Sequence, residues 1–265
     1  MIARVGKIIM NFDIKGGGQP LTMISGMASD LSSWSLQVPS FALNFMTICL
    51  DNRGTGKTDT PDGPFSIEVM AHDTAKLLDV IGVDSSNVVG FGLGGKIALE
   101  MAITHPTKVK SLVLCSTTAM PTPPEVDLLR AMRSIIEKRE GRASLAKLEL
   151  EWTLSPRYLK DRRVAEGVVK ARMARISGTS DDALLRQIEA VLDYDASGRL
   201  QGVKCPTLVV AGSRDRLVPP DLQRQMSEEI PKAKFLSLES SHMVLMEAAK
   251  DFNQNGIGFL MEQGA

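Results

Sequence analysis

Asn87-Val88-Val89-Gly90-Phe91-Gly92-Leu93-Gly94-Gly95-Lys96-Ile97-Ala98 is the stretch of this chain that decides the predicted fold. A short β-branched run leads into a glycine-rich turn, and the turn leads into a segment whose apolar residues recur at helical spacing as far as Ala102. The pair His105-Pro106 ends that helix. The stretch therefore predicts a buried strand, a tight turn and a helix in direct succession.

The same alternation of strand and helix extends on both sides of this stretch. Strands alternating with helices predict an α/β protein with a mainly parallel sheet that is covered on both faces. The predicted strands are 7–14, 21–24, 45–50, 111–115, 205–212 and 234–238, and the predicted helices outside the central stretch are 66–81, 221–229 and 246–260.

One segment interrupts this alternation. Between residues 121 and 200 no convincing strand pattern occurs, and helical patterns cover 124–138, 143–152, 156–176 and 181–194. We therefore expect residues 1–120 and 201–265 to form one core domain, with 121–200 inserted into it as a helical cap.

Composition sets limits on the partners of the protein. Lys and Arg together number 31 and so do Asp and Glu, which gives no electrostatic signal for nucleic acid or for an anionic membrane. We expect a small-molecule substrate or ligand, no nucleic acid, no membrane, no metal and no cofactor. A homodimer stays open at this stage.

The cysteines and the N-terminus bear on the cellular compartment. Cys49, Cys115 and Cys205 show no pairing pattern, which argues against a secreted disulfide framework. The first ten residues contain no long apolar run of the kind that a signal peptide carries. We therefore expect a cytoplasmic protein.

Four short motifs occur in a characteristic order along the chain. They are Asp51-x-Arg53-Gly54-x-Gly56-x-x-Asp59, the glycines of Gly90 to Gly95, Gly212-Ser213-x-Asp215-x-x-Val218-Pro219, and Ser241-His242 with Glu247 downstream. In order and spacing the sequence resembles the α/β-hydrolase superfamily, in particular small capped members such as enol-lactonases and carboxylesterases. The resemblance covers residues 21–260 outside the cap, and it implies an eight-stranded, mainly parallel sheet with helices on both faces.

The resemblance also implies a position for the nucleophile. The family carries its serine in a G-x-S-x-G turn between strand and helix, and Gly92 occupies the place of that serine. The elbow residue has a strained backbone conformation that glycine adopts at little cost. We therefore expect a vacant nucleophile position in an intact fold.

The other site residues follow from the family's chain order of nucleophile, acid and histidine. His242 occupies the place of the histidine, and Asp215 the place of the acid that orients it. The oxyanion hole of the family consists of two backbone N–H groups, which fall on Met27 and Leu93. The loop before Met27 reads Ser25-Gly26, whereas many relatives have His-Gly.

Further residues are candidates for substrate contact or for nucleophilic attack. Gly26, Met120 and Met243 lie in loops or at strand ends that are expected to face the site. Ser25, Ser116 and Ser241 are the serines nearest to the predicted site, but none stands on an elbow, and each has a simpler turn or core explanation.

Three functions from different classes agree with this pattern. The first is a hydrolase scaffold for a small apolar ester or lactone, silent in covalent chemistry while position 92 is glycine. The second is a non-covalent enzyme in which the pair of His242 and Asp215 acts as a general base, as a hydrolase, a lyase or a cofactor-free oxygenase. The third is a non-catalytic protein that binds or senses a small molecule.

Overall fold

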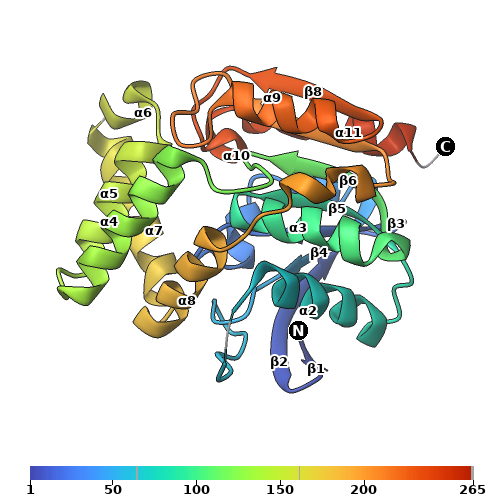
Figure 1. Cartoon of the computed structure of the whole chain (residues 1–265), viewed down its shortest axis with the longest axis horizontal. Helices are drawn as coiled ribbons and strands as arrows, with labels where there is room; N and C mark the ends of the chain where they lie inside the picture. Colours follow the sequence, from blue (N-terminus) through green and yellow to red (C-terminus); the bar gives the residue numbers. More distant parts are fainter. Residues whose placement is uncertain (64, 161, 264–265) are drawn as a thin grey trace.

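A single sheet organises the molecule. The computed structural model describes residues 1–63, 65–160 and 162–263, with no side chains described for 162–164. Its eight strands lie in the order β1-β2-β4-β3-β5-β6-β7-β8 (Figure 1). The two pairs β1–β2 and β2–β4 are antiparallel and the other neighbouring pairs are parallel, which confirms the predicted mainly parallel sheet. The strands are β1 (Ile2–Val5), β2 (Ile8–Lys15), β3 (Gln19–Ile24), β4 (Phe45–Leu50), β5 (Ser86–Phe91), β6 (Val109–Cys115), β7 (Thr207–Gly212) and β8 (Ala233–Leu238).

Each face of the sheet carries its own hydrophobic core. Successive side chains of a strand point to opposite faces, so Val88 of β5 and Leu114 of β6 belong to one buried cluster while Val89 and Val113 belong to the other. Strands buried on both faces are nearly continuous apolar runs, which is the pattern of β5, β6 and β7 in this sequence.

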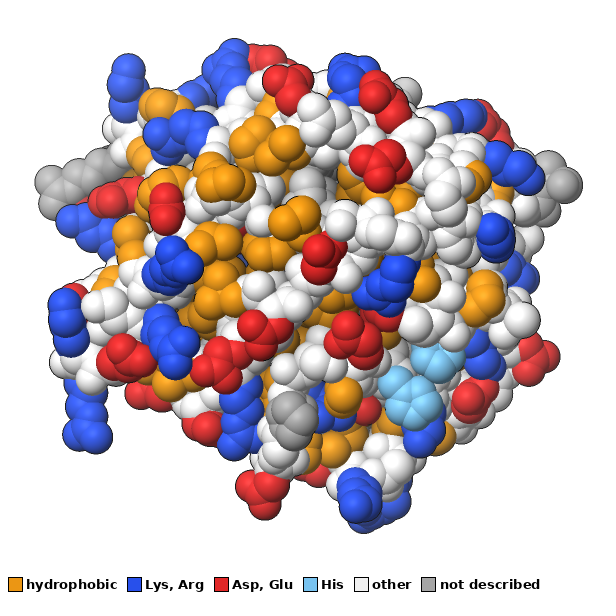
Figure 2. Space-filling model, in the orientation of Figure 1, with side chains coloured by type: hydrophobic (Ala, Val, Ile, Leu, Met, Phe, Trp, Pro, Cys, Tyr) orange, Lys and Arg blue, Asp and Glu red, His pale blue; other side chains and the backbone are white. Residues whose placement is uncertain are grey.

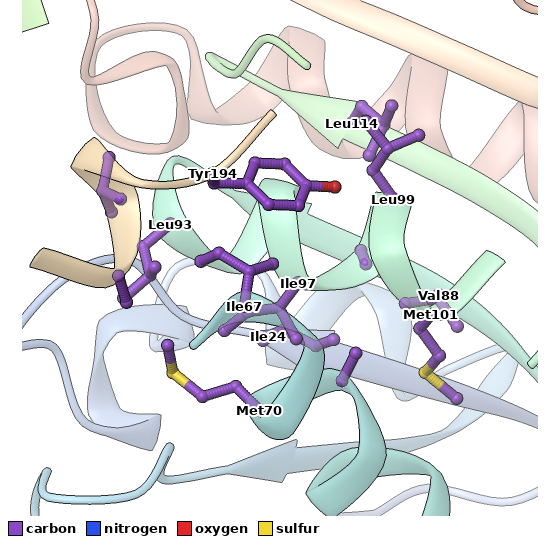
Figure 3. Close-up of a cluster of buried hydrophobic side chains, with 14 of the residues drawn as sticks. Ile24, Ile67, Met70, Val88, Leu93, Ile97, Leu99, Met101, Leu114 and Tyr194 are labelled. Carbon is purple, nitrogen blue, oxygen red and sulfur yellow. The ribbon is translucent and has the colours of Figure 1, made fainter. Parts of the chain in front are cut away.

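Two long helices cover the first face beside the elbow. They are α2 (Ile67–Val80) and α3 (Leu93–Thr104). Figure 3 shows Ile67 and Met70 of α2 close to Ile97 of α3, with Ile24 and Val88 of the sheet in the same cluster. A third helix, α9 (Pro220–Glu229), adds to this core farther along the sheet. The packing of α3 against α2 and against the sheet fixes the direction in which α3 leaves the elbow.

The core on the second face combines aliphatic side chains with aromatic ones. Phe41 of α1 (Val38–Phe41) and Phe252 of α11 (Ala249–Glu262) pack with ring centroids 6.3 Å apart.

The single helix predicted for 246–260 is wrong, because the chain forms α10 (Val244–Glu247) and then α11, with Ala248 between them at φ −125° and ψ 35°. This non-helical junction lies a few residues after His242.

The elements described between β6 and β7 are all helices. Figure 1 shows its helices gathered at one end of the molecule. The helix predicted for 156–176 is found as helix on both sides of residue 161, which itself lies outside the described residues. The helices are α4 (Pro123–Glu137), α5 (Arg142–Thr153), α6 (Pro156–Lys160), α7 (Arg162–Ser177) and α8 (Asp181–Leu192), followed by the 3₁₀ helix η3 (Ser197–Gly202).

The N-terminal strand was not predicted. Ile2–Val5 pairs with β2 through a turn in which Gly6 has a φ of +58°. Ile2 is among the exposed large apolar side chains, and only Val5 of this strand is buried, so β1 lacks the apolar alternation that marks an internal strand.

The surface agrees with the balanced composition. Positive and negative side chains are interspersed over the face shown in Figure 2. Within the described ranges, no helix is long and apolar enough to cross a bilayer. Cys49, Cys115 and Cys205 are free and buried.

Candidate active site

Gly92 alone forms the turn between β5 and α3. Its φ of +55° and ψ of −117° lie in a region that favours glycine. The N–H groups of Gly95 and Lys96 donate to the Gly92 carbonyl at 2.9 and 3.2 Å and so begin the helix. The strand, turn and helix predicted from the sequence are therefore present, with Gly92 at the point of sharpest bend.

The glycines of this turn differ in the space around them. A β-carbon on Gly90 would lie 2.2 Å from the carbonyl oxygen of Gly94, and one on Gly94 would lie 2.1 Å from that of Ile24. These positions allow no side chain. On Gly92, by contrast, a β-carbon would meet only Nε2 of His242, at 4.0 Å. Position 92 thus has room for a side chain, and that side chain would point at the imidazole.

His242 and Asp215 are brought together as predicted. Nδ1 of His242 lies 2.9 Å from Oδ2 of Asp215, and both side chains are buried. The other carboxylate oxygen accepts the N–H groups of Leu217 and Val218 at 2.9 and 2.8 Å, which fixes the carboxylate. Because an ionised carboxylate can only accept, Nδ1 carries the proton and Nε2, the atom facing position 92, is free to accept one.

The environment of His242 acts on its pKa in two directions. Burial, the largest influence, lowers the pKa, but the charge and hydrogen bond of Asp215 outweigh it, with smaller contributions from the charges of Glu125 and Glu149. The pKa of the imidazole is therefore raised above its ordinary value of 6.5. A raised pKa makes the neutral imidazole a stronger base at pH values above it.

The two predicted oxyanion donors line one cavity, which also contains His242 and Gly92 among its lining residues. Met27 and Leu93 both line it, together with Gly26. In the described part of the chain, neither the Met27 N–H nor the Leu93 N–H donates to another residue. Leu93 is the first residue of α3, where an N–H has no acceptor within the helix.

The cavity measures about 170 Å³ and is mainly apolar. Its charged lining residues are Glu125, Glu149, Arg172 and Arg175, all contributed by the helices between β6 and β7. The predicted substrate contact Met243 also lines it. The other lining side chains include Trp34, Leu36, Phe91, Leu128, Leu129, Met132, Leu150, Leu217, Leu245 and Met246.

Met120 does not lie on this cavity, which corrects its prediction as a substrate contact. Its side chain is 48% exposed at the surface. Two hydrogen bonds fix the turn that carries it, from Thr118 Oγ1 to the Met120 carbonyl and from the Ala196 N–H to the Ala119 carbonyl. The strand end was located correctly, but the turn directs this side chain outward.

The serines near the site have structural partners. Ser116 Oγ donates to the His242 carbonyl at 2.8 Å, and Ser25 Oγ lies 2.9 Å from Ser33 Oγ. Ser241 Oγ lies within hydrogen-bonding distance of the Thr153 carbonyl and of Glu247. Among the residues with described side chains, no group of three or more His, Cys, Asp or Glu could hold a metal ion.

Two residues at the site, Arg172 and Gln187, carry no signal in the sequence, and a third, Glu247, stands in a motif that gives it no role. Arg172 and Gln187 bind the backbone of the loop that follows β3, and Glu247 binds the loop that carries His242. Their partners are mostly backbone atoms far away in sequence, so no local pattern could have identified Arg172 or Gln187.

A mainly parallel sheet that presents a tight elbow to a histidine is the arrangement of an α/β hydrolase. The family model described as alpha/beta hydrolase fold matches residues 19–249, so the chain belongs to this family.

Individual relatives refine the comparison. A putative carbamate hydrolase RutD of Azorhizobium caulinodans is 29% identical over 265 residues, which cover 98% of each chain. A 3-oxoadipate enol-lactonase of Acinetobacter baylyi is 24% identical over 233 residues, covering 88% of this chain and 85% of the relative. Among solved structures, the enol-lactonase from Burkholderia xenovorans superposes with a TM-score of 0.91 at 24% identity, covering 98% of this chain and all of the other, a likeness that concerns the fold alone. A thermophilic esterase from Thermogutta terrifontis has a TM-score of 0.87 at 25% identity, covering 99% and 97%.

Proposed function

We propose that this protein is a hydrolase framework for a small, mainly apolar ester or lactone, whose covalent chemistry is silent because Gly92 occupies the nucleophile position. One observation carries the proposal. Of the glycines in the elbow, the one at the family's serine position has room for a side chain, and that side chain would point at Nε2 of His242. The relatives named as a putative carbamate hydrolase and as an enol-lactonase support hydrolysis at a carbonyl group, and the second supports a lactone substrate.

The geometry supports a defined sequence of steps for a serine at position 92. Nε2 of His242 would take the hydroxyl proton as Oγ attacks the substrate carbonyl, and Asp215 would stabilise the imidazolium. The N–H groups of Met27 and Leu93 would bind the developing oxyanion. His242 would then return the proton to the leaving alcohol, and water would release the acyl group by the same route.

The helices α4 to α8 are part of this proposal as a cap. Every charged residue that lines the cavity belongs to them, and so do Leu128, Leu129, Met132 and Leu150. We assign residues 121–200 to the cap and residues 1–120 and 201–265 to the core, and expect the cap to select the substrate. The free, buried cysteines support a reducing compartment such as the cytoplasm.

Restoring the serine tests the proposal. Gly92→Ser should react with a fluorophosphonate probe and hydrolyse p-nitrophenyl acetate at least about 100-fold faster than the unchanged chain, because a missing triad member costs several orders of magnitude. Gly92→Ala is the matched control, since it has the same positive φ and no hydroxyl. Labelling of the unchanged chain would mean that another serine attacks, which would contradict the role given to position 92.

A second candidate function rests on the intact pair of His242 and Asp215. With no side chain at position 92, Nε2 faces open space in which a water or a substrate proton could be activated without a covalent step. If Gly92→Ser stays inert while His242→Ala abolishes a turnover of the unchanged chain, this general-base function replaces the first. If neither the unchanged chain nor Gly92→Ser turns over any substrate, a binding role remains.

A further inference from the structure

We propose that Arg172 and Gln187 are positioning residues that hold the Met27 N–H in place as an oxyanion donor, so that the helices inserted between β6 and β7 complete the oxyanion hole. This inference rests on the proposed function. It assigns a catalytic contribution to two side chains of α7 and α8 that contact backbone of the core domain.

The peptide between Met27 and Ala28 is held at both ends. Its carbonyl oxygen accepts from Nη2 of Arg172 at 2.9 Å, and its N–H donates to Oε1 of Gln187 at 3.0 Å. Nη1 of Arg172 also donates to the Ala28 carbonyl at 2.8 Å and to Ser29 Oγ at 3.0 Å. These contacts join residues at least 143 positions apart in the sequence.

The preceding part of the loop is held by the core domain. Asn52 Nδ2 donates to the carbonyl oxygen of Ser25 at 3.0 Å. The donor N–H of Met27 belongs to the peptide between Gly26 and Met27, so it lies between one peptide fixed by the core and one fixed by the inserted helices. Only the second anchor depends on α7 and α8.

The backbone conformation requires such an anchor. Ala28 has a φ of +45°, in the left-handed region that is unfavourable for a residue with a side chain. A strained conformation persists only where its surroundings determine it. At Ala28 those surroundings include Gln187 on the N–H and Arg172 on the carbonyl.

The two anchoring side chains are themselves fixed. Arg172 is 6% exposed, and its Nε donates to Glu149 of α5 at 2.8 Å, which compensates its charge. Gln187 is fully buried, and its Nε2 donates to the Arg53 carbonyl at 3.2 Å and to Thr55 Oγ1 at 2.8 Å. The amide orientation follows from this network, because its oxygen faces a donor while its nitrogen faces acceptors.

Gln187 provides the sharper test because it is neutral and does not line the cavity. In the Gly92→Ser background, Gln187→Met should lower kcat about 10- to 100-fold, since a misplaced oxyanion donor loses most of its effect, while KM changes less than about threefold. Arg172→Lys keeps the positive charge but loses the fork that binds two carbonyls, and it should lower kcat in the same way.

Arg186→Gln is the matched control. Arg186 is the neighbour of Gln187 on α8, and it also binds core carbonyls, those of Pro61 and Gly63, but away from the cavity. If Arg186→Gln lowers kcat as much as Gln187→Met does, the contacts of α8 merely hold the domains together and the positioning role is wrong.

A second measurement reads the positioning role without turnover, so that it survives a failure of the proposed function. In the chain with Gly92 unchanged, amide hydrogen exchange followed by NMR should be at least about 10-fold faster at Ala28 in Gln187→Met, because the Ala28 N–H loses its acceptor, with the amides of β5 unaffected. Unchanged exchange at Ala28 would overturn the inference. An inert Gly92→Ser variant, by contrast, would count against the proposed function alone.

Discussion

At His242, burial and a neighbouring carboxylate act on the same proton in opposite directions. Burial favours the neutral imidazole, whereas Asp215 favours the imidazolium, and the carboxylate prevails. The imidazole also packs against the ring of Phe91, with centroids 5.3 Å apart, and its backbone carbonyl accepts from Ser116. A base is thus held with one nitrogen bound and the other facing position 92.

An NMR titration of His242 measures this balance in the chain as it stands. The pKa should lie above 6.5. In Asp215→Asn it should fall, because burial then acts without the opposing charge. The native state binds this proton more tightly than the unfolded chain does. The unfolding free energy should therefore decline as the pH rises from about 6.5 through the raised pKa of the native state. A pKa that is the same in both proteins would contradict the assigned cause.

At the level of single residues, chain order predicted what local pattern could not. Gly92, Asp215 and His242 follow from motifs in a fixed order, and the structure brings them together. Arg172 and Gln187 act on backbone atoms 144 to 159 positions away, and nothing near them in sequence specifies that contact. Met120 was placed at the correct strand end, but a single turn decided its direction.

Among the elements, α10 (Val244–Glu247) shows how a very short helix fixes the loop that carries His242. The carboxylate of its last residue, Glu247, accepts the N–H groups of Ser241 and Ser155 at 3.1 and 2.7 Å. Ser155 belongs to the inserted segment, so one side chain joins that segment to the histidine loop. The Thr153 carbonyl reinforces the joint by accepting the Met243 N–H.

Removing this carboxylate should destabilise the protein. Glu247→Ala leaves two backbone donors without their acceptor and should lower the unfolding free energy by about 1–3 kcal/mol. Glu239→Ala is the comparison. Glu239 lies on the same loop as His242 and pairs with Arg214, but it is largely exposed, so its loss should cost less than about 1 kcal/mol. Urea denaturation checks both, and equal losses would argue against the role of Glu247.

Elements were predictable where a periodic pattern dominated. The bounds of β4 agree with the prediction, and α2 lies within one residue of it because Ser66 caps its start and the apolar positions repeat. β1 was missed because it is an exposed edge strand with one buried side chain. The break between α10 and α11 was missed because apolar residues continue across Ala248, and only the backbone conformation there interrupts the helix.

For the molecule as a whole, one buried ion pair connects the elbow helix to the inserted helices. Nζ of Lys96 in α3 lies 3.3 Å from Oε2 of Glu125 in α4, and its side chain is fully buried. Nζ also donates to the Thr118 carbonyl at 3.2 Å. Glu125 accepts the Thr122 N–H in the capping box that begins α4, so the charge pair and the start of the helix depend on each other.

Breaking this pair should cost far more than breaking a surface pair. Lys96→Met should lower the unfolding free energy by about 3–5 kcal/mol, because it strands the buried carboxylate. Adding Glu125→Gln should recover part of that loss. Lys108→Met, which removes a pair with the more exposed Asp79, should cost at most about 1 kcal/mol. Calorimetry or urea denaturation of the four proteins checks the ranking, and a full loss in the double variant would rule out the charge as the cause.

The open space and the positive φ at Gly92 make glycine and serine unequal in backbone strain at this position. Any L-residue at that φ is strained, so a serine there would make the fold slightly harder to maintain, whereas glycine avoids the strain. Folding stability therefore favours glycine at position 92, and only selection for catalytic turnover would favour serine there. The residue at position 92 is thus set by two opposing requirements, catalytic activity and an unstrained backbone.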